Sequence, residues 1–268
     1  MKNIIRLISI LTAMLLLFSG CTLAIPSDLT YTQIADPTLE HIISDNNIIY
    51  VPGSDVKGKI FLDPGHGFSD PGVLGPNYEE DGVCESELVF ELSKKILSVL
   101  VSQGYEVMMC RESDYDIRQE KDMYKVQPED RTKMANDWGA DFFLSVHINS
   151  YEDDPSTNYL LAAYTTKSSP DDATMDAFCT YLLNGMTGTI GSRTTNIEKN
   201  KPATGYYVNT RANMPSILLE IGFITNPTDY ENFRNTSWQQ VAAQGISNGI
   251  INILNSPEYA TYKLTVTQ

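Results

Sequence analysis

Two different spacings of apolar residues recur along residues 58–255. Short, almost continuous apolar runs are typical of buried strands, and apolar residues at every third or fourth position are typical of helices that cover a sheet. The predicted strands are 59–63, 105–110, 141–148, 159–165, 206–209 and 216–223. The predicted helices are 87–103, 128–138, 174–183 and 238–254. Strands that alternate with helices predict an α/β fold, a mostly parallel twisted sheet covered by helices on both faces, in a single domain.

The first 21 residues have the pattern of a targeting segment and are not expected to join the fold. Lys2 and Arg6 precede an apolar run, 7–18, which at about a dozen residues is too short for a permanent membrane span. The following Ser19-Gly20-Cys21 resembles a bacterial lipobox, in which Cys21 is lipidated and becomes the new N-terminus. The alternative is an ordinary secretory signal that is cut near Ser19-Gly20. Both interpretations predict export.

The remaining boundaries follow from composition. Residues 21–57 are polar, without sustained periodicity, and are predicted to form a tether with one short strand at Asn47–Val51. The folded domain is predicted over 58–255, after a leader at 1–20 and before a C-terminal tail at 256–268.

The net charge of the chain limits the classes of partner that it can bind. Acidic residues outnumber basic ones 34 to 19, for a formal net charge of −15. Such a chain has no general electrostatic attraction for nucleic acid or for anionic lipid, so we expect no nucleic-acid partner and a membrane association that depends on the covalent anchor at Cys21. Once Cys21 is lipidated, Cys84, Cys110 and Cys179 remain, which permits at most one disulfide.

Two of the three histidines follow predicted strands. His66 lies between two glycines in a turn after strand 59–63, and His147 lies at the end of strand 141–148. The carboxyl ends of parallel strands gather at one edge of a sheet, where ligand sites form, so the two imidazoles are candidates for one site. The alternative is two unrelated polar residues at strand ends. His41 lies in the tether and is expected to be a solvated surface residue.

A third ligand is expected from the helix that follows the His66 turn. Glu85 and Glu87 lie at its N-terminus, where either could serve only to stabilise the helix. Two histidines and one carboxylate are typical of catalytic zinc, whose fourth position stays open for water. Cys84 is a weaker candidate that would offer a thiolate.

Glu220 interrupts the apolar strand 216–223. A carboxylate is costly to bury there unless it is paired or functional, and it suits a general base that activates water. The alternative is a structural glutamate paired with Arg111, Arg131 or Arg211.

Several segments, taken in order, resemble the zinc-dependent N-acetylmuramoyl-L-alanine amidases of the amidase-3 type. They are FLDPGHGFSDPGVLG (61–75), ESELVFELSKKI (85–96), MCRESD (109–114), RTKMAN (131–136), FLSVHINS (143–150) and MPSILLEIGFITNPTD (214–229). The resemblance covers roughly 58–255. It implies one zinc per chain held by His66, Glu85 and His147, with Glu220 as the catalytic carboxylate, and it favours Glu85 over Glu87.

The resemblance also implies a function. The family hydrolyses the amide between N-acetylmuramic acid and the L-alanine of the peptidoglycan stem, so we expect a monomeric, lipid-anchored enzyme that faces the cell wall and acts on peptidoglycan. Asn149 is a candidate substrate contact or a turn residue, and Asp63 is a candidate partner of His66 or a loop residue. The alternatives are a non-catalytic peptidoglycan-binding lipoprotein and a zinc peptidase that acts on the stem peptide.

Overall fold

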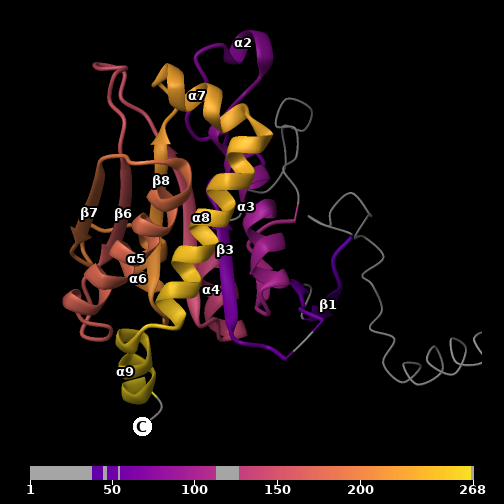
Figure 1. The fold of residues 1–268 in the computed structure, drawn as a ribbon, viewed down its shortest axis with the longest axis vertical. Coiled ribbons are helices and arrows are strands. Elements are labelled where there is room, and N and C mark those ends of the chain that lie inside the picture. The colour runs from indigo at the N-terminus through magenta and orange to yellow at the C-terminus, as the bar shows by residue number, and fades with distance from the viewer. Residues whose placement is uncertain (1–37, 45–46, 54, 113–126, 267–268) are drawn as a thin grey trace, which may run out of the picture.

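The computed structural model describes residues 38–44, 47–53, 55–112 and 127–266, so the predicted lipobox at Cys21 lies outside it. Within these residues, eight strands form one sheet in the order β1-β2-β4-β3-β5-β8-β6-β7 (Figure 1). The strands are β1 (His41–Ser44), β2 (Asn47–Tyr50), β3 (Lys59–Pro64), β4 (Glu106–Met109), β5 (Phe142–Asn149), β6 (Leu160–Thr165), β7 (Thr195–Asn200) and β8 (Ser216–Phe223).

The centre of the sheet is parallel. β4, β3, β5 and β8 run in one direction, which brings the carboxyl ends of β3, β5 and β8 to the same edge. β6 pairs antiparallel with β8 and parallel with β7, and β1 and β2 form an antiparallel pair that joins β4. The predicted fold class, an α/β domain with a mostly parallel sheet, is confirmed.

Helices cover both faces of the sheet. The helices are α2 (Tyr78–Asp81), α3 (Glu85–Ser102), α4 (Pro128–Trp138), α5 (Asp172–Ile190), α6 (Tyr207–Arg211), α7 (Pro227–Arg234), α8 (Thr236–Leu254) and α9 (Pro257–Val266). Buried residues of α3, α5, α8 and α9 form one apolar cluster with the sheet, and buried residues of α4 and α6 contribute to a second. In Figure 1, α2 and α7 lie together at the end to which β8 points.

The two clusters follow from the alternation of side chains along a strand. Ile60 and Leu62 of β3 belong to the cluster under α3, whereas Phe61 between them points to the opposite face. There Phe61 stacks on Phe143 of β5, with ring centroids 5.2 Å apart. Nearly continuous apolar runs are therefore expected on these central strands, because both of their faces are covered.

Several elements differ from the sequence prediction. Residues 206–209 were expected to form a strand, but α6 (Tyr207–Arg211) is a short helix there. The polar strand β7 and the helix α7 were not predicted. The short strand predicted at Asn47–Val51 in the tether is present as β2, whereas β1 was not predicted, and both strands belong to the sheet. The predicted C-terminal tail contains α9, in which Tyr259 and Tyr262 are buried.

The described cysteines do not form a disulfide. Cys84, Cys110 and Cys179 are buried and are not joined by a disulfide. Among the helices that the structure describes, none combines the length and hydropathy that a bilayer crossing requires.

Candidate active site

His66 is presented by a tight loop directly after β3. His66 itself has a positive φ of 59°, Gly67 one of 104° and Phe68 one of 56°. Gly65 lies so close to His147 that a Cβ atom there would be 2.3 Å from the ring. A glycine at 65 is therefore required for the two histidines to approach each other, and their ring centroids are 4.9 Å apart.

Glu85 is the first residue of α3, and its carboxylate is buried between the two histidines. Its Oε2 atom lies 3.1 Å from Nε2 of His66, and its Oε1 atom lies 2.9 Å from Nδ1 of His147. The backbone N–H groups of Val73 and Ile148 also donate to it. Burial alone would raise the pKa of Glu85, but the hydrogen bonds and charges of His147 and His66 outweigh it and lower the pKa to about 2.

His147 lies near the end of β5, opposite Glu220 of the neighbouring strand β8. The register of the two strands shifts just after this pair, between His147 and Asn149. This irregularity interrupts the regular pairing beside the site, and the pairing resumes at Asn149 and Phe223.

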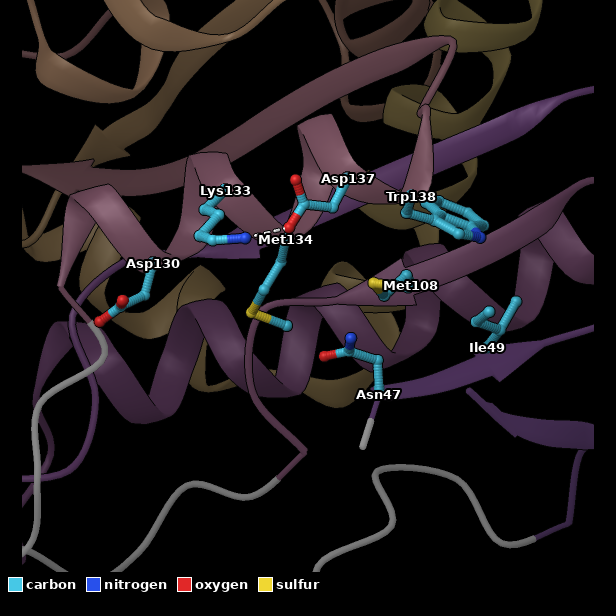
Figure 2. A pocket seen from close by; sticks show the side chains of 8 residues that line it. All are labelled: Asn47, Ile49, Met108, Asp130, Lys133, Met134, Asp137 and Trp138. Atoms are coloured by element: carbon cyan, nitrogen blue, oxygen red, sulfur yellow. Dashed lines mark hydrogen bonds and ion pairs between the residues drawn. The ribbon is translucent and has the colours of Figure 1, made fainter. Parts of the chain in front are cut away.

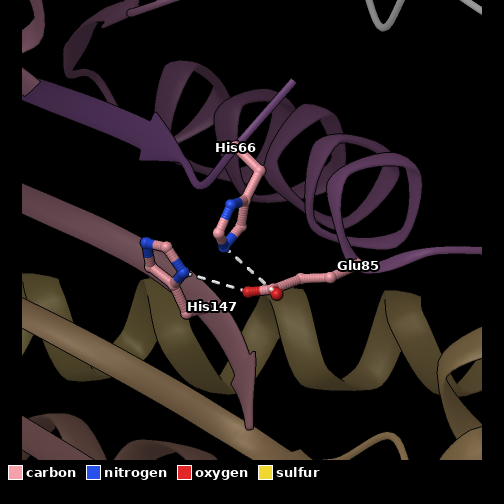
Figure 3. A group of neighbouring side chains, drawn as sticks. All are labelled: His66, Glu85 and His147. Atoms are coloured by element: carbon pink, nitrogen blue, oxygen red, sulfur yellow. Dashed lines mark hydrogen bonds and ion pairs between the residues drawn. The ribbon is translucent and has the colours of Figure 1, made fainter. Parts of the chain in front are cut away.

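The three predicted ligands converge from separate elements, as Figure 3 shows. One ligand atom from each of His66, Glu85 and His147 lies within 4.8 Å of the others. Two imidazole nitrogens and one carboxylate oxygen are a donor set that Zn²⁺ accepts. The half-exposed Glu87 and the buried Cys84 are not part of this group, and Sγ of Cys84 is 3.5 Å from Oγ of Ser86 instead. The donor set therefore fits a metal ion.

The field around His66 favours a positive charge. Burial lowers its pKa, but hydrogen bonds and charges from Asp70 and Glu85 outweigh burial and raise the pKa to about 9. Carboxylates that favour a proton on an imidazole also favour a metal cation beside it.

Glu220 lies beside this group and is only 9% exposed. Its Oε2 atom has no hydrogen-bond partner within the described residues. The charges that shift its pKa most are those of His147, Glu85, His66 and Glu198, and not of an arginine. Burial raises the pKa of Glu220 to about 7, with Glu85 and Glu198 adding to the rise and the two histidines opposing it. A buried carboxylate with an unpaired oxygen and a pKa near neutrality is typical of a general base.

The partner of His66 is Asp70, which the sequence analysis missed. Asp63 instead accepts a 2.7 Å hydrogen bond from Oγ of Ser145 and forms a 2.7 Å ion pair with Arg131. Oδ2 of Asp70 lies 3.0 Å from Nδ1 of His66. The available signal was the Asp-Pro-Gly turn four residues after the histidine, since such a turn brings an aspartate back toward the start of its loop.

Two cavities meet at the four central residues, and both are lined by His66, Asp70, His147 and Glu220. One, of about 360 Å³, has an apolar wall that includes Tyr206, Tyr207, Val208 and Leu218. The other, of about 370 Å³, is lined by polar groups that include Asn149 and Ser150. Asn149 accepts a hydrogen bond from the backbone N–H of Ser150, as a turn residue does, while it also faces this cavity.

A larger cavity of about 560 Å³ lies elsewhere, between α4 and the strands β2 and β4 (Figure 2). Its charged side chains are Asp130, Lys133 and Asp137, and the last two are paired with each other. None of the metal-binding group or Glu220 lines it, so we assign the site to the first two cavities.

The chain is similar to known proteins of one family. Residues 60–252, more than half of the chain, match the family Amidase_3, N-acetylmuramoyl-L-alanine amidase. The chain belongs to this family.

Individual amidases are similar over most of their length. The sporulation-specific N-acetylmuramoyl-L-alanine amidase of Bacillus subtilis is 28% identical over 213 residues, which cover 78% of this chain and 74% of the relative. A crystal structure of an N-acetylmuramoyl-L-alanine amidase from Clostridium difficile 630 superposes with a TM-score of 0.64 at 25% identity, covering 76% of this chain and all of that one. The amidase AmiC2 of Nostoc punctiforme gives 0.63, also at 25% identity, over 76% of this chain and all of its own.

Proposed function

We propose that the protein is a zinc-dependent N-acetylmuramoyl-L-alanine amidase that hydrolyses the amide between the lactyl group of N-acetylmuramic acid and the L-alanine of the stem peptide. The observation that carries the proposal is the position of Glu220, which is buried with an unpaired oxygen beside two histidines and a carboxylate in one cleft. Membership of the amidase family supports this substrate class.

His66, Glu85 and His147 would hold one zinc ion per chain. When bound, zinc lowers the pKa of a coordinated water from about 15.7 toward 7 and polarises the substrate carbonyl. The backbone N–H groups of Val73 and Ile148 hold the Glu85 carboxylate in its orientation between the two imidazoles. The protein thus fixes the donor atoms before the ion arrives.

Glu220 would move the protons. Its carboxylate accepts a proton from the attacking water and then delivers a proton to the nitrogen of the leaving L-alanine. A pKa near 7 suits both steps, because the group gives up and takes a proton with similar ease. Because the apolar strand around Glu220 shields it, bulk water competes little for this proton.

Digestion of purified sacculi, followed by mass spectrometry, tests the reaction. An amidase releases intact stem peptides and leaves glycan strands with unsubstituted lactyl groups. Shortened stems that remain on muramic acid would instead identify a zinc peptidase, and binding to sacculi without any release would identify a non-catalytic binding protein. Either result would refute the proposal.

Metal content tests the ligand set. We expect about one zinc per full chain, and we expect Glu85→Ala to lose most of it, because the carboxylate is the link between the two histidines. Glu87→Ala removes the same charge two residues away and is the matched control. Loss of zinc in Glu87→Ala with retention in Glu85→Ala would contradict the assignment.

We further propose that residues 1–20 are a leader, that Cys21 carries a lipid, and that the enzyme is held at the outer surface of the membrane that faces the wall. The support is the sequence around Ser19-Gly20-Cys21. The names of several relatives, such as the probable cell wall amidase LytH of Staphylococcus aureus, agree with action outside the cell. A Cys21→Ser chain should accumulate as a precursor or as free protein, and membrane retention without lipid label would contradict the anchor.

A further inference from the structure

We propose that Asp70 is a positioning residue for His66, holding the imidazole with its N–H on Nδ1 and its Nε2 lone pair turned toward the metal-binding group. The inference rests on the proposed zinc function and concerns a residue that is not itself a ligand.

Both nitrogens of His66 are engaged, each with a different carboxylate. Nδ1 lies 3.0 Å from Oδ2 of Asp70, and Nε2 lies 3.1 Å from Oε2 of Glu85. A neutral imidazole has one N–H to donate, and the nitrogen that binds a metal must present a lone pair. Asp70 and Glu85 both only accept, so either could hold the single N–H in the absence of a metal. With a metal ion beside Glu85, Nε2 must present its lone pair, and the N–H then lies on Nδ1, where Asp70 accepts it. A carboxylate in this place also makes the imidazole a stronger donor to a cation.

Asp70 is itself held in place by its loop. Its Oδ1 atom accepts a 3.2 Å hydrogen bond from the backbone N–H of Gly72. Its backbone exchanges two hydrogen bonds with Gly67, at 2.8 and 3.1 Å. The side chain is 22% exposed, so water only partly screens its charge at His66.

The loop that carries His66 needs such a support. His66 and Phe68 both have positive φ values, a conformation that costs an ordinary residue about 1–2 kcal/mol. Arg111 and Arg131 fix the backbone of this loop, donating to the carbonyl groups of Gly65 and His66. These contacts place the main chain, and Asp70 supplies the only hydrogen bond from outside the metal-binding group to the ring of His66 that the described residues make.

The two histidines differ in this respect. Within the described residues, the hydrogen bond of His147 to a side chain is the one to Glu85. Its ring is instead fixed by the strand β5 and by contact with Gly65. Loss of Asp70 should therefore change the tautomer of His66 and leave that of His147 unchanged. This difference between the two histidines distinguishes the proposed role from a general effect on the site.

The experiment combines zinc affinity with the tautomer of His66 in the full chain. Zinc dissociation constants come from competition with a chromophoric chelator. Tautomers come from ¹⁵N NMR of histidine-labelled protein, which has three imidazoles to assign. The variants are Asp70→Ala, Asp70→Asn and the control Asp153→Ala, which removes an exposed carboxylate from the loop after β5.

We expect Asp70→Ala to raise the zinc Kd about 10- to 100-fold, the usual effect of removing a hydrogen-bond partner of a ligand. In the metal-free protein, measured above the pKa of His66 (about 9 in the wild type) so that the ring is neutral, His66 should show a mixture of tautomers. Asp70→Asn can still accept from Nδ1 but carries no charge, so it should keep the tautomer and raise the Kd by about tenfold, the lower end of that range. Asp153→Ala should match the wild type in both measurements.

A role limited to loop stability predicts something else. The melting temperature would fall, while the folded Asp70→Ala and Asp70→Asn proteins kept the wild-type zinc Kd and the wild-type tautomer of His66. That result would overturn the proposal. If Asp70→Ala does not fold, an unchanged zinc Kd in Asp70→Asn is by itself enough to overturn the proposal. Failure of the wild type to bind zinc would instead refute the proposed function, so the two failures are distinguishable.

Discussion

Glu220 occupies a position in β8 where every neighbour along the strand is buried. Replacing it with glutamine keeps the size of the side chain but removes the proton acceptor. We expect Glu220→Gln to fold and to bind zinc, because Glu220 is not among the three ligands. We expect its hydrolysis rate to fall by about 10²–10⁴, the usual contribution of a positioned base. Muropeptide release, zinc content and melting temperature measured on one preparation check all three.

A structural glutamate predicts a different outcome for the same variant. Stability would fall by about 1–3 kcal/mol, as for a mispaired buried group, and the folded fraction would keep most of its activity. A stable, zinc-loaded Glu220→Gln protein with near-normal activity would contradict the assignment of the base.

Asp63 and Arg131 form a buried ion pair beneath the His66 loop. Arg131 also donates to the carbonyl groups of Pro64 and His66, so the pair supports the backbone of that loop. Asp63→Asn removes the carboxylate that is paired with the buried guanidinium. We expect it to lower the free energy of unfolding by about 3–5 kcal/mol, the typical cost of breaking a buried pair from one side. Urea denaturation at neutral pH measures this loss.

The same pair should shape the acid stability of the protein. Burial raises the pKa of Asp63, but Arg131 and the hydroxyl of Ser145 outweigh burial and hold the pKa below its ordinary value of 3.8. A carboxyl group whose pKa is lowered by folding stabilises the fold above its unfolded pKa and loses that contribution as the pH falls through the folded value. We therefore expect the difference in free energy of unfolding between the wild type and Asp63→Asn to become smaller below about pH 4. A difference in free energy of unfolding that stays constant with pH would contradict this expectation.

The sequence reveals those site residues that are unusual for the element or turn in which they lie. A glutamate inside an apolar strand and a histidine between two glycines are visible without a structure, and both lie in the cleft. The partner of His66 is not visible in this way. Asp63 and Asp70 are three and four residues from His66, and the choice between them depends on the path of the loop and on the position of Arg131.

At the scale of the elements, α5 and α8 approach closely through glycines. A Cβ atom on Gly249 would lie 2.7 Å from Cα of Leu182, and one on Gly185 would lie 2.5 Å from the carbonyl oxygen of Gly245. These contacts are with backbone atoms, which cannot move aside without shifting a helix. We expect Gly249→Ala to lower the free energy of unfolding by about 1–3 kcal/mol, the usual cost of overpacking.

Gly188 is the matched control for this prediction, since it also lies in α5 but a Cβ atom there would have no described atom of another segment within 4 Å. Gly188→Ala should leave stability unchanged or raise it by about 0.5–1 kcal/mol, because alanine is the better helix former. Thermal unfolding of the two variants compares them directly. Equal changes in stability for Gly249→Ala and Gly188→Ala would show that the close contact between α5 and α8 does not limit stability.

The elements that the sequence did not predict share a physical cause. β7 is an edge strand with mostly exposed side chains, so its sequence, TNIEKN, carries no alternation to detect. In α6, the apolar run Tyr206-Tyr207-Val208 is too short to distinguish a strand from one turn of helix. The outcome there is set by tertiary contacts, including the hydrogen bond from buried Asn209 to the carbonyl of Ala163 in β6.

For the whole molecule, the folded body extends beyond the region of resemblance at both ends. β1 and β2 lengthen the sheet, and α9 is fixed to the body by Tyr259 and Lys263, which both bond to Asp141 at the start of β5. The central strands were predictable because burial on both faces demands apolar residues. The strand β2 was predicted for the same reason, since Ile48 and Ile49 belong to opposite apolar clusters. β1 and α9 were not predicted, because β1 has only four residues and α9 buries only Tyr259 and Tyr262.

Two adjoining cavities, of about 360 and 370 Å³, meet at the candidate active site. If the proposed amidase lays a glycan strand across both cavities, it binds the polymer in the middle of its length, without threading from a terminus. We expect stem release per muramic acid residue to proceed at the same initial rate on long glycan strands and on strands already cut into short pieces by a glycosidase. A rate that rises with the number of strand ends would contradict this. An enzyme of this kind can strip peptides from any exposed stretch of an intact wall.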